Sequence, residues 1–170
     1  MRRLLISILF LLAFAPAWAQ NIASISTEKI LNSIPQYVAA QDQLNTLSDK
    51  YKAAIEKEVG EIEKLYNTYQ ENKFTYPAAQ RSAAENEILS REKSVQEKQK
   101  IYFGEDGILA QKSDELLLPI KKKVDAAIEL VAKAAGYSMI IDLSTVQGVV
   151  YHGGLTDITD QVIQIYNTLK

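Results

Sequence analysis

Few side chains in this sequence have the type and spacing that catalysis needs. The chain of 170 residues contains one histidine, His152, and no cysteine. His152 sits in a Tyr-His-Gly-Gly segment typical of a surface turn, and no second histidine accompanies it to bind zinc. A cysteine nucleophile, a thiolate metal site and a disulfide are excluded by the composition. We therefore expect no catalytic residue, no cofactor and no metal site.

The glycines and carboxylates that follow His152 favour structural roles. Gly153 and Gly154 lack the strand, the helix and the lysine of a phosphate-binding loop. Asp157 and Asp160 lie where a final helix is expected to begin, and negative charge is favourable there. An enzyme of unknown type is the least supported hypothesis, and replacing His152 with alanine would test it.

The charge of the chain argues against nucleic acid as a partner. The formal net charge is −2, and residues 36–118 carry 11 Lys and Arg against 15 Asp and Glu. A nucleic-acid surface needs a basic face that neutralises phosphates. The run Lys121–Lys123 is the clearest basic cluster, and it fits either a solvated helix face or a patch for anionic lipid head groups.

The first nineteen residues have the pattern of a secretory signal peptide. Arg2 and Arg3 precede the apolar run Leu4–Phe14, and Ala17-Trp18-Ala19 supplies the small residues of a cleavage site. The run is too short to span a bilayer, which takes about 20 residues. We expect cleavage near Ala19 and export of a soluble mature chain beginning at Gln20.

Residues 36–118 have the composition and periodicity of two long helices. Before Pro77, apolar residues recur every three or four positions, and after it every seven. The turn is expected at residues 73–77, because proline is favoured at the first position of a helix. The first stripe is Leu44, Leu47, Tyr51, Ile55, Val59, Ile62, Tyr66 and Tyr69, and the second is Ile88, Val95, Tyr102, Leu109 and Leu116.

These stripes predict an antiparallel helical hairpin, a coiled-coil arm whose tip is near residue 75. Folding the chain there places Ile88 against Ile62, Val95 against Ile55, and Tyr102 against the stretch from Leu47 to Tyr51. Pro35 and Pro119 are then expected to interrupt the two helices at the same level of the hairpin. Three glycines inside this stretch are either points where the arm bends or tolerated helix residues; they are Gly60, Gly104 and Gly107.

Residues 20–35 and 119–170 predict a small β-containing body. Strands are expected at residues 22–26 and 137–143, with 148–151 returning as the second strand of a hairpin. Helices are expected at about 27–33, capped by Ser26 or Thr27, at 120–135, ended by Gly136, and after Asp157 or Thr159. The fold class is α+β, mainly α. Unpaired strand edges favour an oligomer built on Ile22, Ile25, Ile140, Ile141, Val149, Val150 and Tyr151.

Aromatic residues follow the predicted arm. For Tyr66, Tyr69 and Tyr102 we favour burial in the seam between the two helices. Phe74 and Tyr76 lie at the tip, where no core exists to bury them, and exposed rings there suit loose contact with apolar segments of other proteins. The candidate contact residues are Tyr66, Tyr69, Phe74, Tyr76, Tyr102 and Phe103.

Several motifs together resemble the Skp (OmpH-like) family of periplasmic chaperones. They are Ile30-Leu31-Asn32-Ser33-Ile34-Pro35-Gln36-Tyr37, the helical hairpin, Leu118-Pro119-Ile120, Ala127-Ile128 with Val131-Ala132, Gly136-Tyr137-Ser138-Met139-Ile140-Ile141-Asp142 and Asp157-Ile158-Thr159-Asp160.

The resemblance implies a periplasmic homotrimer. Its small body holds three arms around a cavity, and unfolded outer-membrane β-barrel proteins are held there without ATP. The best-known members of the family have basic arms that attract acidic clients and lipopolysaccharide, and whether this chain binds lipopolysaccharide or anionic lipid stays open. The arms of this chain are net acidic, so we expect apolar contacts to carry more of the affinity. The alternative is a coiled-coil structural adaptor of the cell envelope that binds one folded partner.

Overall fold

The computed structural model describes residues 21–169, so the predicted signal peptide and its cleavage site lie outside the described residues. The described chain divides into two compact units. We call residues 31–123 the hairpin unit, and residues 21–30 with 124–169 the sheet unit. Among residues 21–169, no helix combines the length and the apolar character that crossing a bilayer requires.

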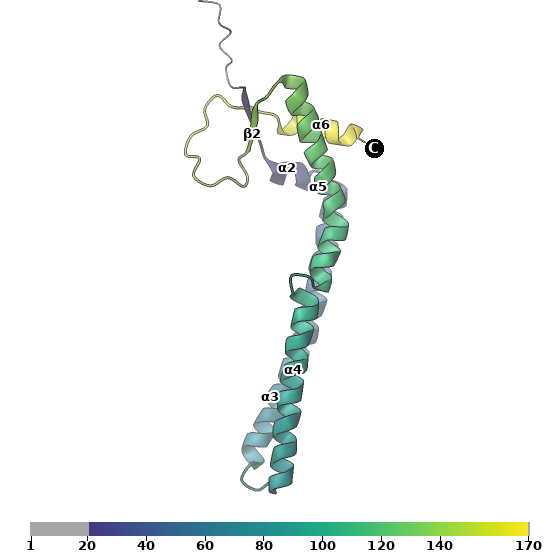
Figure 1. The fold of residues 1–170 in the computed structure, drawn as a ribbon, viewed down its shortest axis with the longest axis vertical. Helices are drawn as coiled ribbons and strands as arrows, with labels where there is room; N and C mark the ends of the chain where they lie inside the picture. Colours follow the sequence, from purple (N-terminus) through teal and green to yellow (C-terminus); the bar gives the residue numbers. More distant parts are fainter. Residues whose placement is uncertain (1–20, 170) are drawn as a thin grey trace, which may run out of the picture. The chain divides into compact units, whose positions relative to one another are not determined.

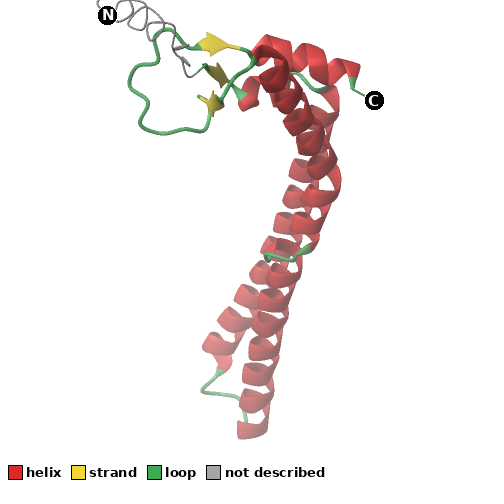
Figure 2. Cartoon of the chain, turned by 45° about the horizontal axis from the view of Figure 1, so that its top comes forward, coloured by secondary structure: helices red, strands yellow, loops and turns green. Residues whose placement is uncertain are grey.

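Two helices of the hairpin unit run side by side and are joined by a tight turn (Figures 1 and 2). Helix α3 spans Pro35–Asn72, with proline at its first position, and α4 spans Ala78–Phe103. The backbone N–H groups of Thr75 and Tyr76 donate to the Asn72 carbonyl at 2.9 and 3.0 Å, which closes the turn. The predicted turn at residues 73–77 is confirmed.

The seam between α3 and α4 buries some of the residues that periodicity selects, whereas Val59 and Tyr66 of the first stripe are 46% and 49% exposed. Ile55 on α3 and Ile88 and Val95 on α4 are buried. Tyr51 stacks on Tyr102 with ring centroids 4.1 Å apart, which confirms the expected pairing at that height. Each helix can bury only one stripe in such a packing, so most of its surface remains exposed.

The return arm is two helices, not one. Helix α4 ends at Phe103, and α5 begins at Ile108 and continues to Ala135. The expected break at Pro119 is wrong, because Pro119 lies inside α5. Proline removes one backbone donor, which leaves the carbonyl of Glu115 without its helical partner. Pro119 and Glu115 are both exposed, so water can serve that carbonyl.

The first part of α5 packs on α3 within the hairpin unit. Ala40 and Leu44 of α3 and Leu117 of α5 form a buried cluster. Tyr37, Leu109 and Leu116 pack against it, and the last two are members of the predicted second stripe. The heptad pattern therefore survives the interruption between α4 and α5.

The sheet unit is built on a three-stranded sheet in the order β2-β1-β3, with both pairings parallel. Strand β1 is Ile22–Ile25, β2 is Met139–Asp142 and β3 is Thr156–Asp157. Helices α2 (Thr27–Asn32), α6 (Thr159–Thr168) and the end of α5 complete the unit. The core residues of this unit include Ala23, Ile25, Ile30, Val124, Ala127, Val131, Ile158, Val162 and Tyr166.

Several predictions for this unit are confirmed and one is wrong. The first two strands lie within the predicted ranges, and α5 ends before Gly136, whose φ is +69°. The predicted strand at 148–151 is part of a loop from Leu143 to Leu155 that swings out from the sheet (Figure 1). A hairpin would pair this segment antiparallel with β2, whereas the third strand is Thr156–Asp157, parallel to β1. Gly148 and Gly154 have φ near +90° and turn the loop away.

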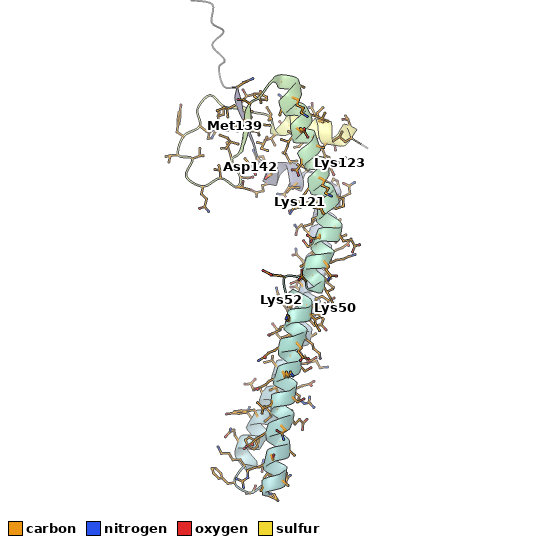
Figure 3. All side chains as sticks on the ribbon, viewed as in Figure 1. Lys50, Lys52, Lys121, Lys123, Met139 and Asp142 are labelled. Atoms are coloured by element: carbon orange, nitrogen blue, oxygen red, sulfur yellow. The ribbon has the colours of Figure 1, made fainter. Side chains whose placement is uncertain are left out.

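The carboxylate of Asp142 ties the end of β2 to the start of α2. It accepts hydrogen bonds from the Thr27 N–H (3.1 Å), the Ser144 N–H (3.0 Å) and the Thr27 hydroxyl. Burial alone would raise the pKa of Asp142, but the bonds from Ser144 and Thr27 outweigh it and hold this pKa well below its usual value. Figure 3 marks Asp142 and Met139, the last and first residues of β2.

Helix α2 is capped at a predicted residue, whereas the N-cap of α6 is Ile158, whose side chain makes no capping bond, so the predicted cap by Asp157 or Thr159 is wrong. The Ser26 hydroxyl accepts from the Lys29 N–H at 3.3 Å, as expected for a cap of α2. Asp157 accepts from the N–H and the hydroxyl of Thr159 at 2.9 and 2.5 Å. The hydrogen bonds from Thr159 lower the pKa of Asp157. Asp157 therefore fixes the start of α6.

Candidate functional site

Residues 21–169 contain no group of three or more histidine, aspartate or glutamate side chains that gathers as a metal site would. His152 is exposed on the Leu143–Leu155 loop, and Asp157 is engaged in holding Thr159. The remaining functional candidates are the exposed apolar side chains and the grooves between helices.

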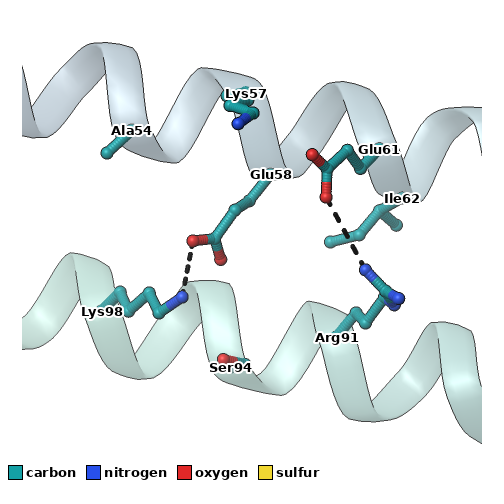
Figure 4. Close-up of a pocket in the computed structure, with 8 residues that line it drawn as sticks. All are labelled: Ala54, Lys57, Glu58, Glu61, Ile62, Arg91, Ser94 and Lys98. Atoms are coloured by element: carbon teal, nitrogen blue, oxygen red, sulfur yellow. Dashed lines mark hydrogen bonds and ion pairs between the residues drawn. The ribbon is translucent and has the colours of Figure 1, made fainter.

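A groove of about 520 Å³ between α3 and α4 is lined by opposite charges (Figure 4). Lys98 Nζ lies 2.5 Å from Glu58 Oε1, and Arg91 lies 3.7 Å from Glu61. The hydrogen bond with Glu58 raises the pKa of Lys98. Lys57 also lines the groove, so three cations and two carboxylates leave it a formal net charge of only +1 with which to capture an ion.

The hairpin unit exposes more large apolar side chains than its seam buries. Phe74, at the tip, is 88% exposed, and the Lys73 ammonium lies 5.2 Å from its ring centroid. A narrow seam cannot cover these residues, and water is a poor solvent for them. The large apolar residues exposed on this unit are Val38, Val59, Tyr66, Phe74, Leu89, Ile101, Phe103, Ile108 and Leu118.

The predicted aromatic residues fall into two groups. Tyr69 and Tyr102 are partly buried at the seam, where Tyr69 hydrogen-bonds to Glu85 and Tyr102 stacks on Tyr51. The bond to Glu85 raises the pKa of Tyr69.

Tyr66, which we expected in the seam, is 49% exposed, so that expectation is wrong. Both rings at the tip were expected to be exposed. Phe74 is exposed, but Tyr76 is half-buried.

A second groove lies beside the interruption between α4 and α5, and sequence reasoning did not find it. We call it the joint groove, and its volume is about 370 Å³. The only signal for it in the sequence is the pair Gly104 and Gly107 within a stretch of good helix formers. The lining residues are Leu44, Asn45 and Ser48 of α3, Phe103 and Gly104, and Leu109, Ala110 and Ser113 of α5.

In the sheet unit, the predicted oligomer residues also separate into two groups. Ile25 is buried, and Ile22, Ile140 and Ile141 are half-buried in the sheet. Val150 and Tyr151 are 97% and 87% exposed on the loop, and Val149 is 41% exposed. Strands β2 and β3 each keep an outer edge that no strand of residues 21–169 pairs with.

The Lys121–Lys123 run lies in α5. Lys121 and Lys122 are exposed and Lys123 is half-buried; Figure 3 marks Lys121 and Lys123.

Comparison with known proteins places these surfaces in context. Residues 21–166 match the family model described as outer membrane protein (OmpH-like). A search of curated proteins found no match to the chain.

Among solved structures, the chain is similar to one assigned as an outer membrane chaperone (OmpH-like) from Caulobacter crescentus CB15. The two share 17% sequence identity with a TM-score of 0.61, and the match covers 91% of this chain and 87% of the other. At that identity, the similarity shows a shared fold.

Proposed function

The chain belongs to the family of OmpH-like outer membrane proteins, and on this premise we propose that it is a periplasmic chaperone that holds unfolded outer-membrane proteins without ATP. The observation that carries the proposal is the row of large apolar side chains exposed along a hairpin too thin to bury them. An unfolded polypeptide exposes apolar side chains of its own, and these associate with such a surface as water is released. The role requires no catalytic residue.

The affinity of this surface rests on many weak contacts. Phe74 and Tyr66 are 88% and 49% exposed, so each ring can make only partial contact with the hairpin itself. Loose contacts of this kind bind varied sequences and leave the client mobile while preventing contact between clients. The ion pairs between α3 and α4 neutralise one another, so specific charge capture adds little.

The sheet unit is proposed as the body that joins three copies of the chain, so that three hairpins enclose the client. Two features support this assembly. The outer edges of β2 and β3 have free backbone groups, which are costly to leave unpaired near other chains. The loop presents Val149, Val150 and Tyr151 to solvent, where an apolar surface without a partner is unfavourable.

Two measurements test the proposal. A denatured outer-membrane β-barrel protein is diluted from urea with and without the chain, in the absence of nucleotide, and light scattering follows its aggregation. We expect suppression at one trimer per client, and no suppression at that ratio would refute the proposal. Sedimentation equilibrium is expected to give the mass of a trimer, and a monomer would refute the enclosed cavity. A coiled-coil adaptor, considered from the sequence, is not favoured by the family.

A further inference from the structure

The joint between α4 and α5 is a built feature of the hairpin unit. It interrupts a stretch of good helix formers between Phe103 and Ile108. A Cβ on Gly104 would lie 2.5 Å from the carbonyl oxygen of Lys100, and one on Gly107 would lie 2.8 Å from the backbone nitrogen of Gly104. Both positions therefore require glycine, because the backbone closes tightly on itself.

The joint groove next to this interruption differs in chemistry from the rest of the arm. None of its eight lining residues is charged, whereas residues 36–118 carry 11 basic and 15 acidic side chains. Leu44, Phe103 and Leu109 supply apolar walls. Asn45, Ser48 and Ser113 add small polar groups. The groove is thus apolar with a few uncharged hydrogen-bonding groups, as ligand sites commonly are.

Phe103 is held in place before any ligand arrives. Its ring lies edge-on to Tyr51 and to Tyr102, with centroids 6.4 and 6.5 Å apart and interplanar angles of 90° and 89°. Phe103 is nevertheless 39% exposed, so part of its ring is free for contact. A ring that is already fixed loses little conformational entropy on binding, and aromatic rings attract one another in edge-on and offset arrangements.

We propose that the joint groove binds an aromatic side chain, preferentially tyrosine, from an unfolded strand of an outer-membrane β-barrel. This inference rests on the proposed chaperone function. The ring would pack on Phe103, Leu44 and Leu109, and the hydroxyl would reach Asn45, Ser48 or Ser113. A charged side chain would lose its hydration without gaining a countercharge. An aliphatic side chain would leave the polar groups of the groove unsatisfied.

The proposed occupant is abundant in the proposed clients. Transmembrane β-strands alternate apolar and polar residues and carry girdles of aromatic residues at both membrane interfaces. The strands of such a client therefore offer aromatic side chains near their ends. A groove selective for that side chain would distinguish outer-membrane strands from other unfolded chains that carry fewer aromatic residues.

The test compares two dye-labelled peptides of about ten residues with the alternating pattern of a membrane strand. One carries a single tyrosine near its end, and the other has leucine at that position. Fluorescence anisotropy against the full chain gives both affinities. We expect wild-type protein to prefer the tyrosine peptide by about fivefold, the size of a favourable aromatic contact. Equal affinities would overturn the proposal.

Two groove variants and two matched controls locate the effect. Phe103→Ala removes the fixed ring, and Ser48→Leu fills the groove while leaving the ring in place. Both are expected to abolish the preference for tyrosine. Phe74→Ala removes an exposed phenylalanine outside the groove, and Thr46→Leu adds leucine at an exposed position of α3 that does not line it. Both controls are expected to retain the preference.

Persistence of the preference in both groove variants would overturn the proposal. Circular dichroism establishes that each variant is folded, and Ser48→Leu keeps the test valid if Phe103→Ala disturbs the stacked rings. The aggregation assay on the same preparations separates the two levels of inference. Suppression of aggregation without any preference for tyrosine refutes the groove alone. Absence of suppression by wild-type protein refutes the chaperone function.

Discussion

The sheet unit and the hairpin unit are stabilised by different means. The sheet unit fully buries Ile30, Ile158 and Val162, and two of its carboxylates, Asp142 and Asp157, accept at least two hydrogen bonds each. The hairpin unit buries a narrow seam, and the ion pairs that cross between its helices are partly exposed. The sheet unit is stabilised by a buried core, whereas the hairpin unit keeps most of its residues at the surface.

The difference teaches why an extended hairpin suits binding. A helix in a two-helix packing has one buried stripe, and its other faces are free to carry apolar residues that a globular unit would have to cover. Val59, Tyr66 and Leu89 are such residues. Exposed ion pairs contribute little to stability, so residues on those faces can change with small effect on folding. Four substitutions sharpen this comparison, in order of expected effect.

Asp142→Asn is expected to have the largest effect, because it weakens the hydrogen bonds that tie β2 to α2. Bonds to a charged group are the stronger kind, and partial exposure lowers their worth, so we expect a loss of about 1–2 kcal/mol in the free energy of unfolding at neutral pH. Urea unfolding followed by circular dichroism measures it. Asp114→Asn makes the same charge change at an exposed position of α5 and is expected to have almost no effect.

The contribution of Asp142 also depends on pH with a defined sign. Its pKa in the folded chain lies below the ordinary value of about 4. The unfolded chain therefore binds the proton first as the pH falls. The stabilisation is complete above about pH 4 and is lost progressively below it. The stability of Asp142→Asn should fall less than that of wild-type protein between neutral pH and pH of about 3; an identical fall would contradict the role of this carboxylate.

A pair of glycine substitutions within the hairpin unit is expected to have smaller effects of opposite sign. A Cβ on Gly60 meets nothing within 4 Å, so Gly60→Ala should raise the stability by about 1 kcal/mol through helix propensity. Gly107→Ala forces a Cβ against the backbone of the joint and should lower the stability by at least a similar amount. Thermal unfolding of both variants compares them. Stabilisation by Gly107→Ala would show that the joint is not tightly closed.

Glu58→Gln is expected to have the smallest effect. It removes the ion pair with Lys98 across the groove between α3 and α4, where both side chains are partly exposed. The loss of stability should be slight at low salt and disappear at high salt, because salt screens exposed charges. Thermal melts at two salt concentrations measure it, with Glu63→Gln on the exposed face of α3 as the control. A large, salt-independent loss would mean that the hairpin depends on this pair.

The sequence by itself determined the helical hairpin, part of its seam, the turn before Pro77 and the end of α5 at Gly136, but not the interruption between α4 and α5. Each follows from local signals: apolar periodicity selects the buried face, and proline and glycine mark the ends. Resemblance of the terminal motifs also identified the family. The aromatic candidates could be named from sequence, but their exposure could not, since whether Tyr66 is covered depends on the distance to the neighbouring helix.

Only the tertiary structure decided the features that depend on contacts between distant parts of the chain. The residues Val149–Tyr151 have good strand propensity, yet Thr156–Asp157 pairs with β1, because strand formation depends on a partner far along the chain. Pro119 lies within α5, although proline disfavours helix interiors, because the groups it leaves unpaired face solvent. The joint groove exists because α3 supplies one wall and α5 the other, and no window of sequence contains both.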